Sequence, residues 1–314
     1  MITAELITRD RVVKLHPISI TVTEKCGAAS YANAVFYASD ISCKCGDKLR
    51  IRESDTLIFS GFIFEHGIDS ENRLTVLAYD CLRYLQCTGS YFISQATASS
   101  LVRRIANDFM LPTADIAETA HVIPLIDFDE QSLMNIISFA LAETKANTAR
   151  SYMLLSDDCK VSLIDRRSYF YSKPISDENV ICAYETKLSA EGCANVIKLT
   201  SAGKGGYRYS YTAKDEDSIH ALGYLKYSRS VSGKSTFELK ELAHSLLAQK
   251  STPAFTADLE CRFLAGLRAG MQITLSVKKP SLYGTYAVDS LVHRIDENEK
   301  VSILRLKGAT NGAY

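Results

Sequence analysis

Apolar and polar residues alternate with a period of two at residues 18–22 and 48–52. Three further apolar segments, residues 57–59, 61–64 and 74–78, continue this series of expected strands. Short polar turns, such as Glu53-Ser54-Asp55, separate them. Alternation of this kind is typical of strands with one buried face. Its regular interruption by turns predicts an antiparallel barrel or sandwich over residues 1–78.

The pattern changes to a helical period between about residues 79 and 175. One apolar stripe consists of Leu101, Val102, Ile105, Phe109 and Met110. Ser99 is the expected N-cap of this helix, and Leu111-Pro112 its end. A second helix is expected after Asp129, and residues 152–164 are expected to form a hairpin around Asp157-Asp158. The stretch therefore predicts a small α+β unit.

Strand patterns return from about residue 180. They cover residues 196–199, 207–211, 223–227, 254–259 and 272–277, and two further strands end at Leu306. One helix interrupts them at about 236–250, opened by the capping box Ser235-Thr236-Phe237-Glu238. Residues 176–314 are thus expected to form a second β module that contains one helix.

The two β regions echo each other in sequence. Residues 46–51, 59–64 and 73–77 match 270–275, 283–288 and 300–304 in the order of glycine turn, alternating strand, second glycine and closing strand. This echo predicts two related barrels in one chain, although unrelated antiparallel hairpins converge on similar patterns. The predicted domains are 1–78, 79–175 and 176–314, with strands near 180–200 as candidates to complete the first barrel. The fold class is mainly β with an α+β insertion.

Composition narrows the class of protein. The 314 residues carry 36 basic and 36 acidic side chains, so the formal net charge is zero. A protein that grips nucleic-acid backbone normally carries a surplus of positive charge, so specific nucleic-acid binding is not expected. No segment reaches the roughly 20 apolar residues of a membrane span. Nine cysteines and an N-terminus without a hydrophobic signal core predict reduced thiols and synthesis in the cytoplasm.

The metal and nucleophile motifs that the sequence offers are weak. Cys43 and Cys45 are one residue apart, which is closer than paired zinc ligands usually are, and no second pair follows. In a strand both would face the same side and pack as small apolar groups. The histidines are scattered singly at His16, His66, His121, His220, His244 and His293. We therefore expect no metal, no cofactor and no catalytic residue.

The carboxylate clusters are better explained by local structure than by catalysis. A glycosidase needs two carboxylates across a cleft. The clusters are Asp127, Asp129 and Glu130, then Asp157 and Asp158, then Asp215, Glu216 and Asp217. We expect Asp129 to cap a helix, Asp157-Asp158 to form a turn, and 215–217 to be a solvated loop. Gly203-Lys204-Gly205-Gly206 lacks the spacing of a phosphate-binding loop.

Tyrosine is abundant, with 17 residues, and tryptophan is absent. Tyr207, Tyr209 and Tyr211 would share one face of a strand, and Tyr224 and Tyr227 follow nearby. Such a face is consistent with aromatic cross-strand pairs inside a barrel. It is equally consistent with an aromatic subunit interface, and the sequence leaves both open.

Several segments together resemble the baseplate hub proteins of contractile phage tails, in the branch found in PBSX-like prophages and phage-tail-like bacteriocins. The resemblance covers about residues 15–307 and lies in segments 74–85, 97–106, 195–199, 211–215 and 223–225. It implies a non-enzymatic structural protein with two tail-tube-like barrels. Three copies would form a pseudo-hexameric ring that joins the hexameric tail tube to the trimeric spike.

The partners implied by this resemblance are two further copies of the chain, the tail tube protein, the central spike protein, and the baseplate wedge and tape-measure proteins. The chain would be assembled in the bacterial cytoplasm and then carried in the virion or tail-like particle. The alternative is a cell-wall-directed module of the same particle, either a peptidoglycan hydrolase or a glycan-binding protein, housed in residues 79–175. A soluble β-rich enzyme is a weaker third hypothesis.

Overall fold

A computed structural model describes residues 2–38, 41–202, 208–232, 235–279 and 281–308 of the chain. Most of these residues form β-strands. The chain folds as two compact units, the first comprising Met1–Glu185 with Ala257–Leu306 and the second Thr186–Thr256 with Lys307–Tyr314. Among the described residues, no helix is long and apolar enough to cross a membrane.

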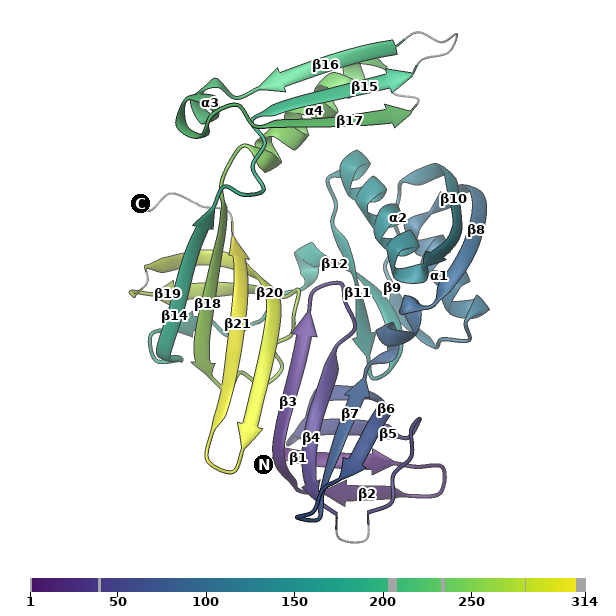
Figure 1. Ribbon diagram of the computed structural model, residues 1–314, viewed down its shortest axis with the longest axis vertical. Helices are drawn as coiled ribbons and strands as arrows, with labels where there is room; N and C mark the ends of the chain where they lie inside the picture. The colour runs from purple at the N-terminus through teal and green to yellow at the C-terminus, as the bar shows by residue number, and fades with distance from the viewer. Residues whose placement is uncertain (1, 39–40, 203–207, 233–234, 280, 309–314) are drawn as a thin grey trace. The chain divides into compact units, whose positions relative to one another are not determined.

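A large sheet forms the framework of the first unit (Figure 1). Its first half has the strand order β3-β4-β7-β6-β5-β1-β2. These strands are β1 Ile2–Ile7, β2 Val12–Leu15, β3 Pro17–Lys25, β4 Tyr31–Tyr37, β5 Lys48–Glu53, β6 Thr56–Ile68 and β7 Arg73–Tyr79. Alternate residues are buried along them, as the period of two predicts. The buried faces share one apolar core that includes Ile20, Phe36 and Leu74.

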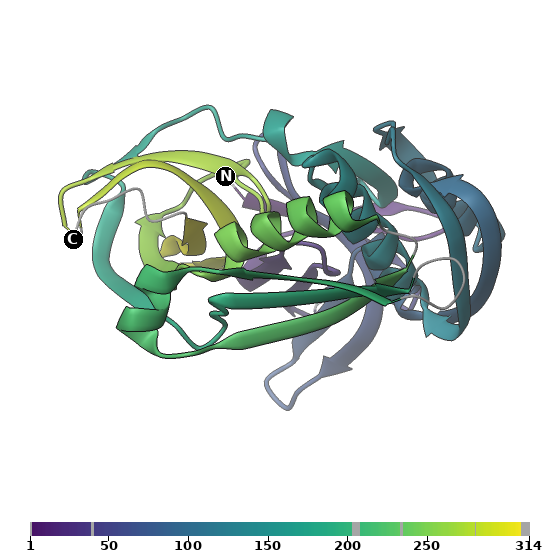
Figure 2. The same ribbon diagram turned by 90° about the horizontal axis from the view of Figure 1, so that it is seen from above.

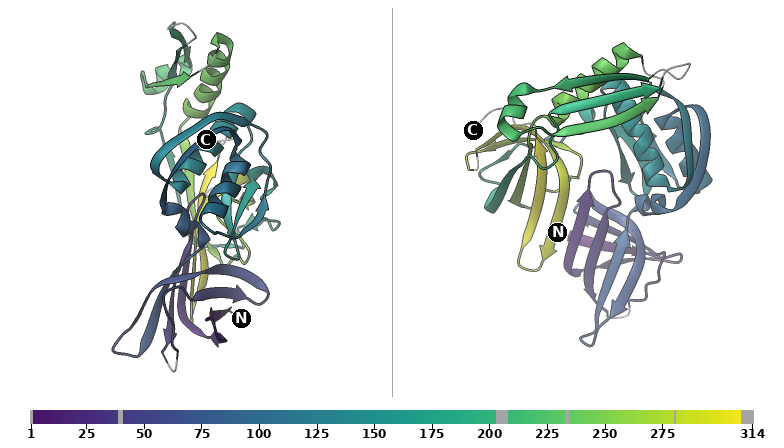
Figure 3. Two further views of the ribbon diagram at one scale, coloured as in Figure 1. Left: turned by 90° about the vertical axis from the view of Figure 1, so that its right-hand side faces the viewer. Right: turned by 45° about the horizontal axis from the view of Figure 1, so that its top comes forward.

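The second half of the sheet has the order β14-β18-β21-β20, with β19 also paired to β20 and β13 paired to β19. These strands are β13 Ile175–Ser176, β14 Val180–Ser189, β18 Ala254–Arg262, β19 Gln272–Val277, β20 Leu282–Asp296 and β21 Lys300–Gly308. The two halves join where β20 pairs antiparallel with β3, as the adjacent yellow and purple strands of Figure 3 show. The mainly β fold class is confirmed, whereas closure into barrels is not detected among the described residues.

The two halves repeat one strand order. In chain order β3, β4, β5, β6 and β7 correspond to β14, β18, β19, β20 and β21, and both sets pair in the order first-second-fifth-fourth-third. The backbone agrees in detail. Gly46 N donates to Ile63 O and Ile63 N to Asp47 O, both at 2.8 Å. Gly270 N donates to Val288 O at 2.8 Å, and Val288 N to Met271 O at 2.9 Å.

These hydrogen bonds correct the sequence alignment by one residue in the second strand. The echo in sequence places Phe64 opposite Val288, but the pairing register makes Ile63 the equivalent of Val288. Gly46 and Gly270 have φ of 94° and 89°, a conformation that favours glycine. The glycine turn is therefore the reliable marker of the repeat.

Residues 80–174 form an α+β region of the first unit. Its elements are η1 Cys81–Gln86, β8 Thr88–Thr97, α1 Ala98–Asp108, β9 Thr113–Ile116, β10 Val122–Ser132, α2 Leu133–Thr148, β11 Tyr152–Asp157, β12 Lys160–Asp165 and η2 Arg166–Ser168. The helices α1 and α2 pack on one apolar core with the antiparallel strand pair β8–β10 (Figure 3). The predicted hairpin around Asp157-Asp158 is confirmed by the antiparallel pair β11–β12.

Two of the expected helix caps are wrong. Thr97, not Ser99, caps α1, because its hydroxyl accepts from Ser100 N in a capping box. Ser99 is instead buried and donates to Glu118. Strand β10 continues through Asp129 to Ser132, which precedes α2 without a side-chain cap. The N-cap is the residue at which the backbone changes from extended to helical. Several serines, threonines and aspartates lie near each helix start here, and all of these residue types are favourable N-caps, so the sequence alone does not identify the capping residue.

The second unit is a three-stranded sheet with one long helix against it (Figure 2). Its elements are β15 Val196–Ala202, β16 Arg208–Lys214, α3 Glu216–Leu222, β17 Lys226–Ser232 and α4 Thr236–Lys250. The predicted α4 and its Ser235–Glu238 capping box are confirmed. The expected loop at 215–217 is wrong, because Asp215 caps α3. Strand β17 also begins three residues later than Gly223, where the sequence pattern placed it.

Candidate functional site

Within the part of the chain that the structure describes, the weak motifs of the sequence do not gather into a reaction centre. Cys43 is buried, whereas Cys45 is exposed and its thiol donates to Phe64 O at 3.3 Å. The expectation that both thiols share one strand face is wrong, because Cys43 lies in an irregular segment and Cys45 in a turn with Gly46. The described residues contain no group of three or more histidine, cysteine, aspartate or glutamate side chains placed to hold a metal ion.

The carboxylates of the α+β region have structural partners. Asp129 accepts from the Ser90 hydroxyl at 2.7 Å. Asp158, in the β11–β12 turn, binds Lys48 at 2.9 Å and Arg50 at 2.8 Å, both on β5. It also accepts from the Ser60 hydroxyl at 2.7 Å. Burial alone would raise the pKa of Asp158, but these hydrogen bonds outweigh it and lower the pKa to about 2.

Two of the histidines and two of the tyrosines have structural contacts. His293 is buried beside the Ser302 hydroxyl, 2.9 Å from its Nδ1, and burial lowers its pKa. Tyr211 and Tyr227 pack against the core of the second unit, and Tyr211 Oη lies 3.0 Å from His244 Nε2. By contrast, Tyr209 and Tyr224 are exposed. Tyr207 and the glycine-rich segment 203–206 lie outside the described residues.

The most informative site is the seam between β20 and β3. The register runs from Ser290 opposite Lys25 to Asp296 opposite Ser19. Beside it Arg268, in the turn before β19, contacts Glu24 on β3 at 3.3 Å. Glu24 is only 3% exposed and also accepts from Ala269 N at 3.1 Å. A buried ion pair therefore fixes the two halves of the sheet to each other.

A second buried acid lies close to this pair. Asp80 is 2% exposed and accepts from the backbone amides of Ser30 at 3.1 Å and Leu82 at 3.0 Å. Burial raises the pKa of Asp80 to about 7, although these amides and the nearby Arg268 favour its charged form. The folded chain therefore holds a proton on Asp80 under conditions where the unfolded chain does not.

This proton makes stability depend on pH with a defined sign. Between the unfolded value of 3.8 and the folded value of about 7, only the folded state binds the proton, so raising the pH destabilises it. We expect the free energy of unfolding, relative to that of Asp80→Asn, to fall across this window by up to about 1.4 kcal/mol per pH unit.

The measurement is urea unfolding of both proteins from pH 4.5 to pH 8. Taking the difference cancels His293, whose lowered pKa acts in the opposite direction below its unfolded value. A difference that stays constant or rises with pH would contradict a raised pKa at Asp80.

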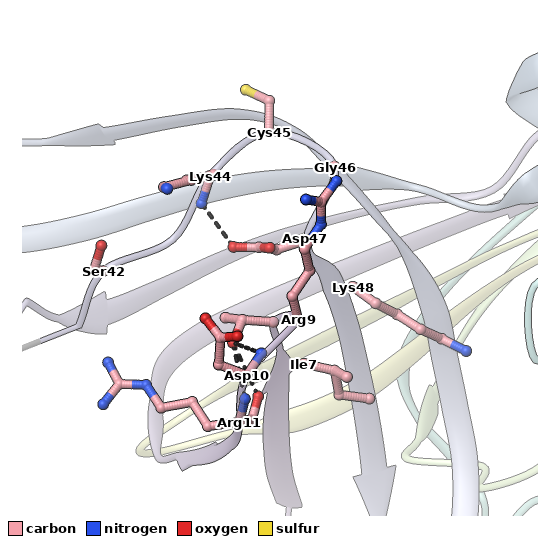
Figure 4. Close-up of a pocket in the computed structure, with 11 residues that line it drawn as sticks. Ile7, Arg9, Asp10, Arg11, Ser42, Lys44, Cys45, Gly46, Asp47 and Lys48 are labelled. Carbon is pink, nitrogen blue, oxygen red and sulfur yellow. Dashed lines mark hydrogen bonds between the residues drawn. The ribbon is translucent and has the colours of Figure 1, made fainter.

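An open hollow of about 700 Å³ lies next to the first glycine turn (Figure 4). It is lined by the β1–β2 turn, residues 7–11, and by the loop 42–48 that leads into β5. Its basic side chains are Arg9, Arg11, Lys44 and Lys48, and its acidic ones Asp10 and Asp47. Lys48 is bound to Asp158. The hollow is an exposed mixed-charge surface and has no enclosed, apolar lining of the kind that binds small molecules.

Sequence reasoning missed the seam because its partners are far apart along the chain. Glu24 and Arg268 are separated by 244 residues, and neither belongs to a recognisable motif. The sequence does mark β3 by its alternation and Gly270 by the repeat, but neither pattern identifies the partner across the seam.

Comparisons with known proteins agree with a tail-protein fold. The PBSX phage-like element protein XkdQ of Bacillus subtilis (strain 168) is 28% identical over 252 residues, which cover 79% of this chain and 77% of that protein. A tail protein from Neisseria meningitidis MC58 superposes with a TM-score of 0.72 at 13% identity, covering 98% of this chain and 96% of that one.

A more distant likeness is to the E. coli c3393 protein, a type VI secretion component with structural similarity to the T4 bacteriophage tail proteins gp27 and gp5. Its TM-score is 0.58 at 8% identity, and the match covers 99% of this chain and 78% of that one. Together these likenesses support a structural protein of the phage tail or baseplate kind. A family model described as YQBQ-like matches residues 18–307, and the chain therefore belongs to the YQBQ-like family.

Proposed function

We propose that this chain is a non-enzymatic hub subunit of the baseplate of a contractile phage tail or tail-like particle. Three copies form a ring of six similar strand modules, which joins the six-fold tail tube to the three-fold spike. The first module lies in residues 1–78, and the second consists of β14 and β18–β21 within residues 176–314, while residues 79–175 form an insertion between them. The observation that carries this proposal is the strand order that occurs twice in one chain.

The repeat supports the proposal because it reconciles two symmetries. A ring of three identical chains has only three-fold symmetry, but two similar modules per chain present six similar positions to a six-fold partner. The names of its relatives point to the same setting, since they include a protein of the phage-like element PBSX and a tail protein. The c3393 protein is itself described as similar to gp27 and gp5.

No observation favours the cell-wall alternative. Two of its carboxylate candidates have structural partners: Asp158 holds the β11–β12 turn to β5, and Asp129 accepts a hydrogen bond from the Ser90 hydroxyl. In the proposed setting the partners are the tube and spike proteins, together with wedge and tape-measure proteins. The subunit is assembled in the bacterial cytoplasm before it becomes part of the particle.

The test is the mass of the assembled protein. The chain is purified alone and after co-expression with the tube and spike proteins of the same phage element, and each sample is measured by light scattering and imaged by electron cryo-microscopy. We expect a species that contains three copies of the 34.7 kDa chain, with six similar modules around its axis. A chain that stays monomeric in every sample contradicts the proposed function.

A further inference from the structure

The β20–β3 pairing, called the internal seam below, joins the two halves of the sheet. The repeat provides a second pair of equivalent strand edges that are not paired with each other in the chain. In the seam, the second half of β20 pairs with β3. The repeat makes β6 the equivalent of β20 and β14 the equivalent of β3, because the Gly46–Ile63 and Gly270–Val288 hydrogen bonds match. The counterpart of the seam would therefore join the second half of β6 to β14.

Both of these strand edges are free among the described residues. Beyond Ile63, strand β6 pairs with β7 on one side only, and β14 pairs only with β18. Asp69 N donates to Arg73 O across the β6–β7 hairpin. Alternation along the strand then directs the amides and carbonyls of His66 and Ile68 to the open side. Such an edge is a template for another strand.

The side chains on these edges are unusually apolar for exposed strands. On β6, Phe64 is 38% and Ile68 60% exposed, and on β14, Tyr184 is 48% and Leu188 56% exposed. Large exposed apolar residues at a strand edge mark a surface that is covered in an assembly.

The glycine turn beside the internal seam is covered by Met153 of β11 and by the end of β3, whereas the equivalent turn at Gly46 is open. A Cβ on Gly270 would lie 2.3 Å from Met153 Sδ and 3.6 Å from Cys26 Sγ, and Cys26 directly follows β3. A Cβ on Gly46 would have nothing within 4 Å. A basic residue stands two positions before each of these glycines. Arg268, before Gly270, is bound to buried Glu24, whereas Lys44, before Gly46, is exposed beside the hollow of Figure 4.

From these observations we infer that the β6 edge of one copy, Phe64–Ile68, pairs antiparallel with the β14 edge of the next copy. The contact repeats between chains the β20–β3 pairing found within the chain. It is head-to-tail, so repeated contacts generate a ring in which internal and intermolecular seams alternate. The inference rests on the proposed function, which supplies the number of copies.

The other free end of the sheet is a weaker choice. Strand β2 has only four residues, and it lies beyond β1, which pairs antiparallel with β5. The strand at the corresponding place in the second half is β13, which pairs parallel with β19. The repeat therefore provides no internal model for a contact through β2.

Cysteine cross-linking tests the contact directly. In a background with Cys45→Ser and Cys87→Ser, which removes two exposed thiols, Gly67→Cys is combined with Glu185→Cys or with Lys187→Cys. All three positions are exposed. After treatment of the assembled complex with a short bis-maleimide, we expect covalent dimers and trimers on a denaturing gel. Variants that carry only one of the two introduced cysteines should give none.

The matched control replaces Gly67→Cys by Thr274→Cys, also exposed but on β19, which lies between β20 and β13. It should not cross-link with Lys187→Cys.

A second pair of variants, His66→Pro and His66→Ala, tests whether the open edge of β6 is needed for assembly. Only the proline lacks the outward amide, so it should abolish the trimer while both purified monomers unfold at the same urea concentration.

The outcomes separate the two proposals. A trimer by light scattering that gives no cross-link through either β14 position, or that survives His66→Pro, overturns this contact and leaves the proposed hub intact. The absence of a trimer in the unmodified complex overturns both. Cross-linked trimers with the Gly67→Cys pairs and none with Thr274→Cys support both.

Discussion

Replacing Arg268 by methionine is expected to lower the free energy of unfolding of the first unit by about 3–5 kcal/mol. Methionine keeps the apolar stem of the side chain, but it leaves the carboxylate of Glu24 buried without its cation. The substitution also removes the 2.9 Å hydrogen bond from Arg268 to Ser156 O. A buried, uncompensated charge is among the costliest changes that a folded protein can receive.

The control is a double-mutant cycle measured by urea unfolding. Glu24→Gln alone leaves Arg268 without its charge partner, whereas Glu24→Gln with Arg268→Met removes both charges. The double variant should recover a large part of the loss, because a buried ion pair replaced on both sides is often close to neutral. A loss below about 1 kcal/mol for Arg268→Met would show that the pair does not hold the two halves of the sheet together.

Much of the fold could be predicted because it depends on local patterns. The period of two located β3 and β5, and the capping box at Ser235 located the start of α4. The Asp157-Asp158 turn was also visible in sequence. In each case residues that are close in sequence determine the element. They do so through the alternation of buried and exposed positions in a strand, or through the hydrogen bonds at one helix end.

The remaining features depend on residues distant in sequence. The partnership of Glu24 with Arg268 and the contacts of Asp158 with β5 join segments more than 100 residues apart, which no local pattern encodes. The error at Cys43 and Cys45 has a different, local cause. Gly46, at φ 94°, turns the chain immediately before β5, so the two thiols never share a strand face.

The sequence predicts the repeat correctly at the glycine turns but not in the strand that follows them. Gly46 and Gly270 align correctly because both occupy the same left-handed turn. The next strand aligns one residue out, since a glycine in a strand does not have to mark the same position in two copies. Gly61 and Gly284 were matched by their place in the pattern, yet Gly61 lies in the packed interior and Gly284 is at φ 108° with open space around it.

Gly61→Ala is therefore expected to destabilise the first unit by about 3 kcal/mol, the upper part of the usual range for overpacking. A Cβ at this position would lie 2.4 Å from Tyr79 O and 2.6 Å from Phe59 Cζ. The aromatic ring can rotate, but the Tyr79 carbonyl belongs to β7, so relief of this contact requires β6 and β7 to move apart.

Gly67→Ala is the control on the same strand, because no described atom lies within 4 Å of a Cβ built on Gly67. It should change the free energy of unfolding by less than about 0.5 kcal/mol. Equal effects of the two substitutions in urea unfolding would mean that β6 does not approach β7 as closely as the structure requires.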